Sequence, residues 1–130
     1  MTVRLTPHFL LSELACHDGT PVPEKYLNNA RAICARAEIL RAAAGCPLIV
    51  VSGYRSPTYN ARIGGAKRSQ HMTASALDLV SRTMTAAQLR AIYLNLIKAG
   101  KVLDGGVGTY PNFVHIDIGP PRRWKGGHGS

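Results

Sequence analysis

Two short polar motifs set within strand-like runs constrain this chain more than any other feature. The first carries His71 and Asp78 seven residues apart, and the second carries His115 with Asp117 two residues later. Two imidazoles and one carboxylate suit a zinc ion that keeps its fourth position open for water, as in hydrolytic zinc sites. Any fold of this chain that uses such a site must bring together segments that lie far apart in the sequence.

The second motif alternates polar and β-branched residues, which indicates a strand. Because residues two apart on a strand share a face, His115 and Asp117 are expected to point the same way. Another strand is predicted over Ala76–Val80, with Asp78 near its middle. If the two strands are neighbours, His71 on the preceding loop completes a three-ligand cluster. The spacing alone fits packed or surface histidines as well.

Periodicity and end signals predict the remaining elements. Apolar residues recur at helical spacing from Tyr26 to Ala44, and Gly45 followed by Pro47 ends that helix. The other predicted elements are a helix or turn over Leu5–Ala15, a buried strand over Leu48–Ser52, a helix from Pro57 to about Ile63 capped by Ser56, a helix with the face Leu89–Ile97 after a Thr85–Gln88 capping box, and strands over Gly105–Tyr110 and Phe113–Ile118.

Length and composition predict one α+β domain over residues 1–130. A chain of 130 residues with 45% hydrophobic residues can build one core but not two. We expect a small, mainly antiparallel sheet flanked by the two long helices. The residues after Ile118 are rich in Gly, Pro, Lys and Arg, so residues 119–130 are predicted to form a loosely ordered basic tail.

The charge balance points to an anionic partner. Sixteen Lys and Arg against seven Asp and Glu give a net charge of +9. Nucleic acid, an acidic membrane face or an anionic cell-wall polymer would each fit, and so would a basic surface that serves only solubility. Nucleic-acid binding is the least favoured, because clustered basic residues beside an aromatic occur only around Arg122, Arg123 and Trp124.

Cysteine usage and hydropathy exclude several classes of protein. Cys16, Cys34 and Cys46 form no C-x-x-C pair, so no thiolate zinc cluster is predicted, and Cys34 is expected to be a buried small hydrophobe. No secretory h-region and no bilayer-spanning apolar run is present. We therefore expect a soluble protein, whose delivery to a cell wall would need a removed leader or release by lysis machinery.

Several stretches occur together in a characteristic order. They are Val51-Ser-Gly-Tyr-Arg-Ser-Pro57, Ser69-Gln-His71 through Asp78, and Phe113-Val-His115-Ile-Asp117, with Phe9-Leu-Leu-Ser-Glu13, Asn60, Gly64-Gly65 and Arg123-Trp124 around them. This set resembles the zinc D-Ala-D-Ala carboxypeptidase-like family, the M15 peptidases, in its small single-domain branch of murein endopeptidases and phage lysins. The resemblance implies a fold of the hedgehog and DD-peptidase type. It also implies hydrolysis of D-amino-acid-containing bonds in peptidoglycan stem peptides, by a DD-carboxypeptidase or a cross-link endopeptidase. We expect the protein to be a monomer.

The resemblance also implies roles for individual residues. His71, Asp78 and His115 match the family's three zinc ligands. Arg55 matches an arginine that acts on the substrate's carboxylate or on the developing oxyanion. Ser69 matches a serine that holds the substrate backbone. Arg55 could equally cap a strand end at the surface, and Ser69 could cap a helix.

Two departures from the family pattern bear on chemistry. Ala74 stands where the family has glycine, which we expect ordinary backbone geometry to tolerate. Asn112 and Phe113 stand where better-studied branches carry a catalytic acid or histidine. Asp117 is then our candidate for the general base or for orienting a ligand histidine, against the alternative of a buried carboxylate held by an arginine. Asp104 is the reserve candidate for the base.

The missing acid also favours an alternative function. A domain that kept its zinc ligands but lost its base would be a non-catalytic zinc or cell-wall-binding module. The retained Arg55 and Ser69 argue for the enzyme.

Overall fold

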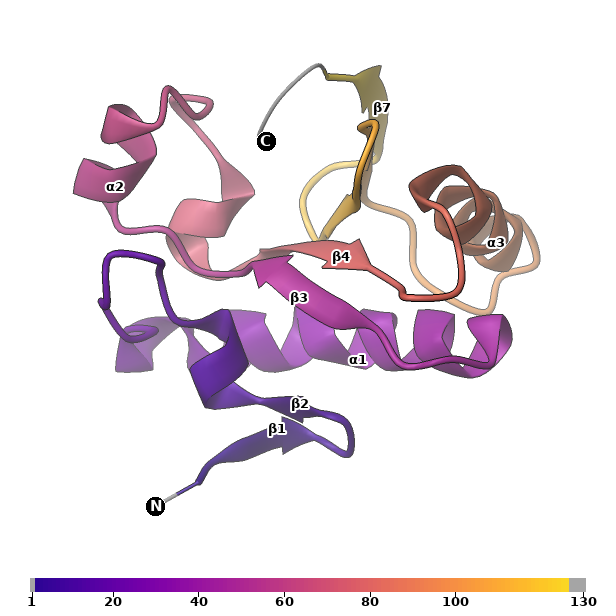
Figure 1. The fold of residues 1–130 in the computed structure, drawn as a ribbon, viewed down its shortest axis with the longest axis horizontal. Helices are drawn as coiled ribbons and strands as arrows, with labels where there is room; N and C mark the ends of the chain where they lie inside the picture. The colour runs from indigo at the N-terminus through magenta and orange to yellow at the C-terminus, as the bar shows by residue number, and fades with distance from the viewer. Residues whose placement is uncertain (1, 127–130) are drawn as a thin grey trace.

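The structure is a computed structural model that describes residues 2–126. Its strands and helices are β1 (Arg4–Thr6), β2 (Phe9–Leu10), α1 (Leu27–Ala44), β3 (Ile49–Ser52), α2 (Pro57–Arg62), β4 (Ala76–Val80), α3 (Ala86–Lys98), β5 (Gly106–Thr109), β6 (Val114–Asp117) and β7 (Arg122–Lys125) (Figure 1). Short 3-10 turns cover Leu11–Leu14, Glu24–Tyr26 and Gln70–Thr73. β1 and β2 form a hairpin, and the other strands form one sheet in the order β3-β4-β6-β5-β7. All its neighbouring strands are antiparallel except β5 and β7, which confirms the predicted α+β class with a mainly antiparallel sheet.

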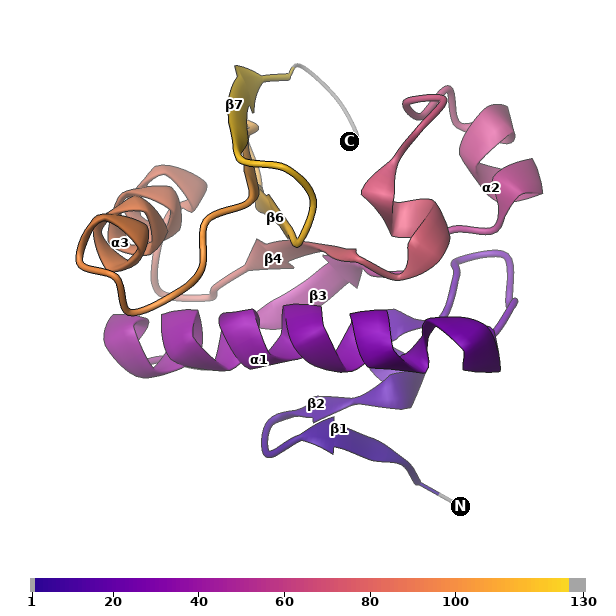
Figure 2. The ribbon, with the colours of Figure 1, turned by 180° about the vertical axis from the view of Figure 1, so that it is seen from behind.

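The two long helices lie on the same side of the sheet. α1 packs against β4, and α3 packs against α1 and against β4, β5 and β6. Leu77, Leu79, Val114 and Ile116 face this layer and are at most 1% exposed. Because side chains alternate along a strand, the residues between them point to the opposite face. On that face α2 and β7 stand apart from each other, as Figures 1 and 2 show from front and back.

Helix boundaries follow the signals in the sequence. Gly45, in the left-handed region with φ 70°, ends α1. Thr85 Oγ1 accepts a hydrogen bond from the Gln88 backbone N–H at 3.1 Å, and Gln88 Oε1 accepts one from the Thr85 N–H at 2.9 Å. The capping box predicted at the start of α3 is therefore confirmed. The Ser56 side chain caps α2, as predicted.

The N-terminal prediction was wrong in part, because residues 4–10 form a hairpin instead of a helix or turn. Glu38 on α1 accepts hydrogen bonds from Thr6 Oγ1 at 2.7 Å, from the His8 backbone N–H at 2.6 Å and from His8 Nδ1 at 2.7 Å. The hairpin is thus held by Glu38 of α1, which lies 30 residues after His8 in the chain.

The strand after α1 was also predicted to be buried, and this was wrong. β3 is the edge of the sheet, and Ile49 is 36% exposed. A β-branched run predicts a strand but does not reveal whether that strand is central.

The predicted loose tail is contradicted over residues 122–125, which form β7. This strand pairs in parallel with β5, with Gly106 opposite Arg122 and Gly108 opposite Trp124. Trp124 Nε1 donates a hydrogen bond to Tyr110 Oη at 2.8 Å, and an added Cβ at Gly108 would lie 2.7 Å from the Trp124 ring. Glycine in β5 therefore makes room for the indole. Residues 127–130 of the predicted tail lie outside the described residues.

The three cysteines are free, and Cys34 is fully buried as predicted. Among the described residues, none of the helices combines the length and apolar character needed to cross a membrane.

Candidate metal centre

Register between two central strands brings the first two site residues together. Asp78 on β4 and His115 on β6 are directly paired across the antiparallel ladder. Directly opposed side chains on one face of such a pair lie about 4.5–5.5 Å apart at Cβ. The alternating hydrophobic neighbours bury the other face, so a slip of either strand by one residue would turn its polar group into the core.

His71 reaches the same point from a single 3-10 turn before β4. The Ser69 hydroxyl accepts a hydrogen bond from the His71 backbone N–H at 3.2 Å, so the capping role considered for Ser69 is present. The turn ends at Ala74, whose φ of 57° lies in the left-handed region. The expectation of ordinary backbone geometry at Ala74 was therefore wrong. A left-handed residue at this position explains why the family pattern has glycine.

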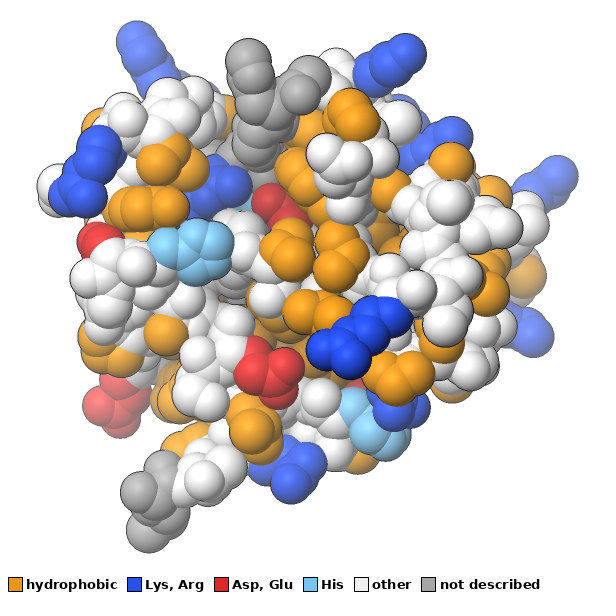
Figure 3. All heavy atoms as spheres, in the orientation of Figure 1, with side chains coloured by type: hydrophobic (Ala, Val, Ile, Leu, Met, Phe, Trp, Pro, Cys, Tyr) orange, Lys and Arg blue, Asp and Glu red, His pale blue; other side chains and the backbone are white. Residues whose placement is uncertain are grey.

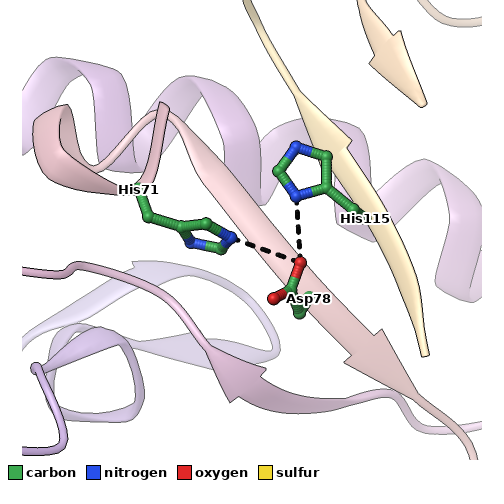
Figure 4. Close-up of side chains that lie close together, drawn as sticks. All are labelled: His71, Asp78 and His115. Atoms are coloured by element: carbon green, nitrogen blue, oxygen red, sulfur yellow. Dashed lines mark hydrogen bonds and ion pairs between the residues drawn. The ribbon is translucent and has the colours of Figure 1, made fainter. Parts of the chain in front are cut away.

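The three side chains form a compact, buried cluster (Figure 4). His71 Nε2 lies 3.3 Å and His115 Nδ1 lies 3.0 Å from the same oxygen of Asp78, Oδ1. One ligand atom from each residue lies within 4.8 Å of the others, and none of the three residues is more than 3% exposed. The structure thus brings together the three residues that the sequence had marked as metal ligands.

The second nitrogen of each ring is held by an acceptor. His71 Nδ1 donates to the backbone carbonyl of Gly53 at 2.6 Å, and because a carbonyl can only accept, the lone pair sits on Nε2. His115 Nε2 lies 2.7 Å from Asp117 Oδ2. Each ring therefore turns its other nitrogen toward Asp78. Carbonyl or carboxylate partners on the far nitrogen are typical of metal-binding histidines.

Asp117 is saturated with donors on the far side of His115. Five N–H groups point at its carboxylate, from the Gly106 and Gly119 backbones, from His115 Nε2 and from Arg122 Nη1 and Nη2, at 2.7–3.1 Å. Its carboxylate contacts the ring through Nε2, whereas the cluster lies at Nδ1. Asp117 is fully buried. This geometry fits an orienting role and an arginine-held carboxylate, and argues against the general-base role.

Burial and charge act in opposite directions on the pKa values of the cluster. Burial lowers the pKa of His71, which favours the neutral form that a metal ligand needs. Burial by itself would raise the pKa of Asp78, but the His71 and His115 rings more than offset it, so the pKa lies below its usual range. Burial likewise opposes the charged form of His115, yet Asp117 and Asp78 raise its pKa overall. A metal ion must therefore compete with a proton at His115.

The donor set fits a divalent metal ion. Ligand atoms at about 2.0–2.2 Å from a tetrahedral zinc lie about 3.3–3.6 Å from one another, slightly more than the 3.3 and 3.0 Å that separate His71 Nε2 and His115 Nδ1 from Asp78 Oδ1. Two neutral nitrogens and one carboxylate oxygen are ligands that zinc prefers. His71, Asp78 and His115 could thus hold such an ion without large rearrangement.

Arg55 lies beside the cluster and not at the surface. Its Nη2 lies 3.6 Å from Asp78 Oδ2, and the residue is 4% exposed. Asn60 Oδ1 accepts a hydrogen bond from Arg55 Nη1 at 3.4 Å, and Asn60 Nδ2 donates to the Ala66 carbonyl at 2.8 Å. Asn60 thereby links Arg55 to the Gly-Gly loop, a role that the sequence pattern did not reveal.

Two hollows open on either side of the cluster. One, of about 190 Å³, is lined by Asp78, Arg55, His17, Tyr59 and Phe113 among others. The other, of about 240 Å³, is lined by His115, Arg68, Ser69, Gln70, Tyr110 and Trp124 among others. Figure 3 shows the molecule in the orientation of Figure 1, with most of the visible Lys and Arg side chains around its outline.

Some expected residues do not join the cluster, and others were missed. Asp104 pairs with Arg123 at 2.8 Å, and both side chains are about 40% exposed. His17 was not singled out in the sequence; its side chain is exposed, and it lines the same hollow as Asp78. Tyr110 was not singled out either. The residues next to them in the sequence do not indicate a site role, because the packing of distant loops and strands is what brings both side chains near the cluster.

Comparison with known proteins agrees with this geometry. A family model described as Peptidase M15 matches residues 5–117. The probable peptidoglycan L,D-endopeptidase MepK of Haemophilus influenzae is 37% identical over 84 residues, which cover 59% of this chain and 42% of that protein. The peptidoglycan L,D-endopeptidase MepK of Escherichia coli K12 is 38% identical over 85 residues, covering 60% of this chain and 43% of that protein. The aligned part of this chain thus spans less than half the length of these curated relatives.

Proposed function

This chain belongs to the peptidase M15 family, and from that premise we propose that it is a zinc-dependent peptidase acting on peptidoglycan. The observation that carries the proposal is the buried cluster of His71, Asp78 and His115, with ligand atoms within 4.8 Å of one another. The relatives named as peptidoglycan L,D-endopeptidases support the substrate. The bond cut is proposed to be one that contains a D-amino acid, and the chain to act as a monomer.

The shape of the site favours a cross-link endopeptidase over a DD-carboxypeptidase. Hollows open on both the Asp78 side and the His115 side of the cluster. A peptide chain can therefore continue in both directions from the bond that lies over the ligands.

The residues around the cluster would share the work of hydrolysis. A bound zinc ion would activate water and polarise the scissile carbonyl. Arg55 would direct its guanidinium to the carbonyl oxygen as negative charge develops there, or to a substrate carboxylate. Its burial strengthens such an interaction, because water screens it less. Ser69 lines the second hollow and would contact the substrate backbone.

Asp117 would act by positioning His115. Its carboxylate holds Nε2, and Arg122 holds the carboxylate through two N–H groups at 2.8 and 3.1 Å. The ring is thereby fixed with Nδ1 toward Asp78. Carboxylate partners of this kind also make a ligand histidine more basic.

Charge supports an anionic stem peptide as the partner. The hollow beside His115 is lined by Arg68 and Arg122 and, among the described residues that line it, by no acid. The chain as a whole carries +9. Anionic wall polymer would be attracted to the same surface.

Metal content and muropeptide digestion test the proposal together. We expect about one zinc per wild-type chain and loss of stoichiometric metal in His71→Ala, Asp78→Ala and His115→Ala, because two remaining ligands rarely hold zinc tightly. His8→Ala, on the N-terminal hairpin, is the matched control and should keep its metal. Purified cross-linked muropeptides should be cleaved by the wild type and protected by a chelator. Wild-type protein that stays metal-free when zinc is supplied would overturn the proposal.

The second candidate function is a non-catalytic zinc or wall-binding module. Asn112 and Phe113 favour it, since neither can take a proton at the position where related enzymes carry an acid or histidine. Such a module would bind metal and muropeptides but release no cleaved product at any enzyme concentration.

A further inference from the structure

Hydrolysis at this cluster needs a group that accepts a proton, and the hollow beside Asp78 contains a candidate. Phe113 lines this hollow but cannot accept a proton, and Arg55 is a permanent cation. Asp78 also lines this hollow, but its carboxylate is a candidate metal ligand. Among the other described residues that line the hollow, His17 is the one with a basic nitrogen. Imidazole is the side chain that most often serves as a general acid or base.

The loop that carries His17 is fastened next to Arg55. Ser56 Oγ donates to Asp18 Oδ2 at 2.8 Å, and the Ser56 backbone N–H points at Cys16 Sγ at 3.5 Å. Within the loop, the Cys16 N–H donates to the Thr20 carbonyl at 2.8 Å, and the Thr20 N–H donates to Asp18 Oδ1 at 2.9 Å. Both neighbours of His17 are therefore tied to the residue that follows Arg55.

The imidazole itself is oriented by Tyr59 on α2. Tyr59 Oη lies 3.4 Å from His17 Nδ1, and the two rings meet edge-on with centroids 6.0 Å apart. A contact at Nδ1 leaves Nε2 as the nitrogen for proton transfer. His17 is exposed.

We propose that His17 is the catalytic proton carrier of this peptidase, in place of the acid or histidine that Asn112 and Phe113 replace. The inference rests on the proposed function. His17 Nε2 takes a proton from the attacking water as the water oxygen bonds to the scissile carbonyl carbon. It returns the proton to the amine nitrogen as the carbon–nitrogen bond breaks, so water is consumed, one acid and one amine are formed, and the imidazole ends as it began.

The charged groups around His17 suit this exchange. Arg55 and Asp78 line the same hollow and carry opposite charges. Asp18 follows His17 in the turn and is bound to Ser56, and the guanidinium carbon of Arg62 lies 6.0 Å from the centroid of the Tyr59 ring.

Steady-state kinetics on cross-linked muropeptides with zinc-loaded full-length chain test the proposal. His17→Gln should lower kcat by about 100-fold or more, in line with the contribution of general acid–base groups, with KM changed less than about threefold. The zinc content and the thermal unfolding midpoint should match those of the wild type, because His17 is exposed and is not one of the three candidate metal ligands. His8→Gln is the matched control and should keep full kcat. Added imidazole should restore part of the activity of His17→Ala, which a purely structural role would not allow.

Each outcome decides a different question. A His17→Gln variant that turns over within threefold of the wild type overturns the role of His17 and leaves the proposed function intact. A large loss of kcat accompanied by loss of zinc or of thermal stability also overturns it, because the effect would then be structural. Wild-type protein that binds zinc but cleaves nothing overturns both proposals at once.

Discussion

Replacing Asp117 with asparagine tests how the protein orients His115, a candidate metal ligand. The carboxylate has two oxygens, of which Oδ1 faces Gly106, Gly119 and Arg122, and Oδ2 faces His115 and Arg122. An amide must place its NH2 group against donors in either orientation. In the better one the backbone N–H groups keep their acceptor, and the NH2 group meets His115 Nε2–H and Arg122 Nη2–H.

The magnitude follows from the two bonds lost. Hydrogen bonds to charged groups contribute about 1.5–3 kcal/mol each, so the upper estimate is about 3–6 kcal/mol. The Arg122 side chain is 42% exposed and can be rehydrated, which moves the expected loss to about 3 kcal/mol of unfolding free energy. If the His115 ring changes tautomer to recover a bond at Nε2, Nδ1 becomes protonated and ceases to be a ligand. Zinc affinity should therefore fall about 10–100-fold.

Urea unfolding of metal-free protein and zinc competition with a chromophoric chelator measure the two effects. Asp104→Asn is the matched control, since Asp104 also binds an arginine of β7 at 2.8 Å but lies at the surface. It should cost less than about 1 kcal/mol and leave zinc affinity unchanged. An Asp117→Asn variant with wild-type zinc affinity, and stability within 1 kcal/mol of the control, would refute the positioning role.

Three further outcomes follow from local geometry. Thr85→Ala removes the N-cap of α3 and should lower the unfolding free energy by about 1 kcal/mol in urea titrations; no change would mean that tertiary packing alone holds the helix end. Burial raises the pKa of the Cys34 thiol to about 12 from 9.0, so at pH 8 iodoacetamide should label the partly exposed Cys46 and spare Cys34. As pH rises above 9 the unfolded thiol ionises first, so folded stability should fall between pH 9 and 12. Ala74→Gly removes the strain of a left-handed alanine, about 1–2 kcal/mol. It also loses a buried methyl group worth about 0.8 kcal/mol and raises the conformational entropy of the unfolded chain, and both of these lower stability. We expect a net change under about 1 kcal/mol, whereas Ala74→Val should destabilise by more than about 2 kcal/mol, as measured by thermal unfolding.

The candidate ligands could be found from the sequence because their surroundings are locally regular. Alternation in the second motif identified His115 and Asp117 as residues of one strand face, and the run Ala76–Val80 did the same for Asp78. These patterns depend on backbone period and capping, which act over a few residues. The resemblance to a known family then connected them with His71.

The role of Asp117 shows where local reasoning stopped. The strand pattern predicts that the Asp117 carboxylate lies on the same face as His115. It does not predict that the carboxylate contacts Nε2 of that ring or that Arg122 binds it. That contact exists because the supposed loose tail adds β7 to the sheet edge at β5. The pairing depends on glycines in β5 that admit Trp124, a fit between segments that no single stretch reveals.

The amino-acid sequence by itself determined most of the helices and strands and the caps of α2 and α3, because each depends on neighbours along the chain, and the resemblance to a known family added the identity of the three candidate ligands. Only the tertiary structure decided that β3 is an edge, that residues 122–125 form a strand, and that His17 lies in the hollow beside Asp78. These features depend on strand register and on packing between segments that are far apart in the sequence. Each contact requires two surfaces that fit each other, and the sequence of one segment does not reveal its partner.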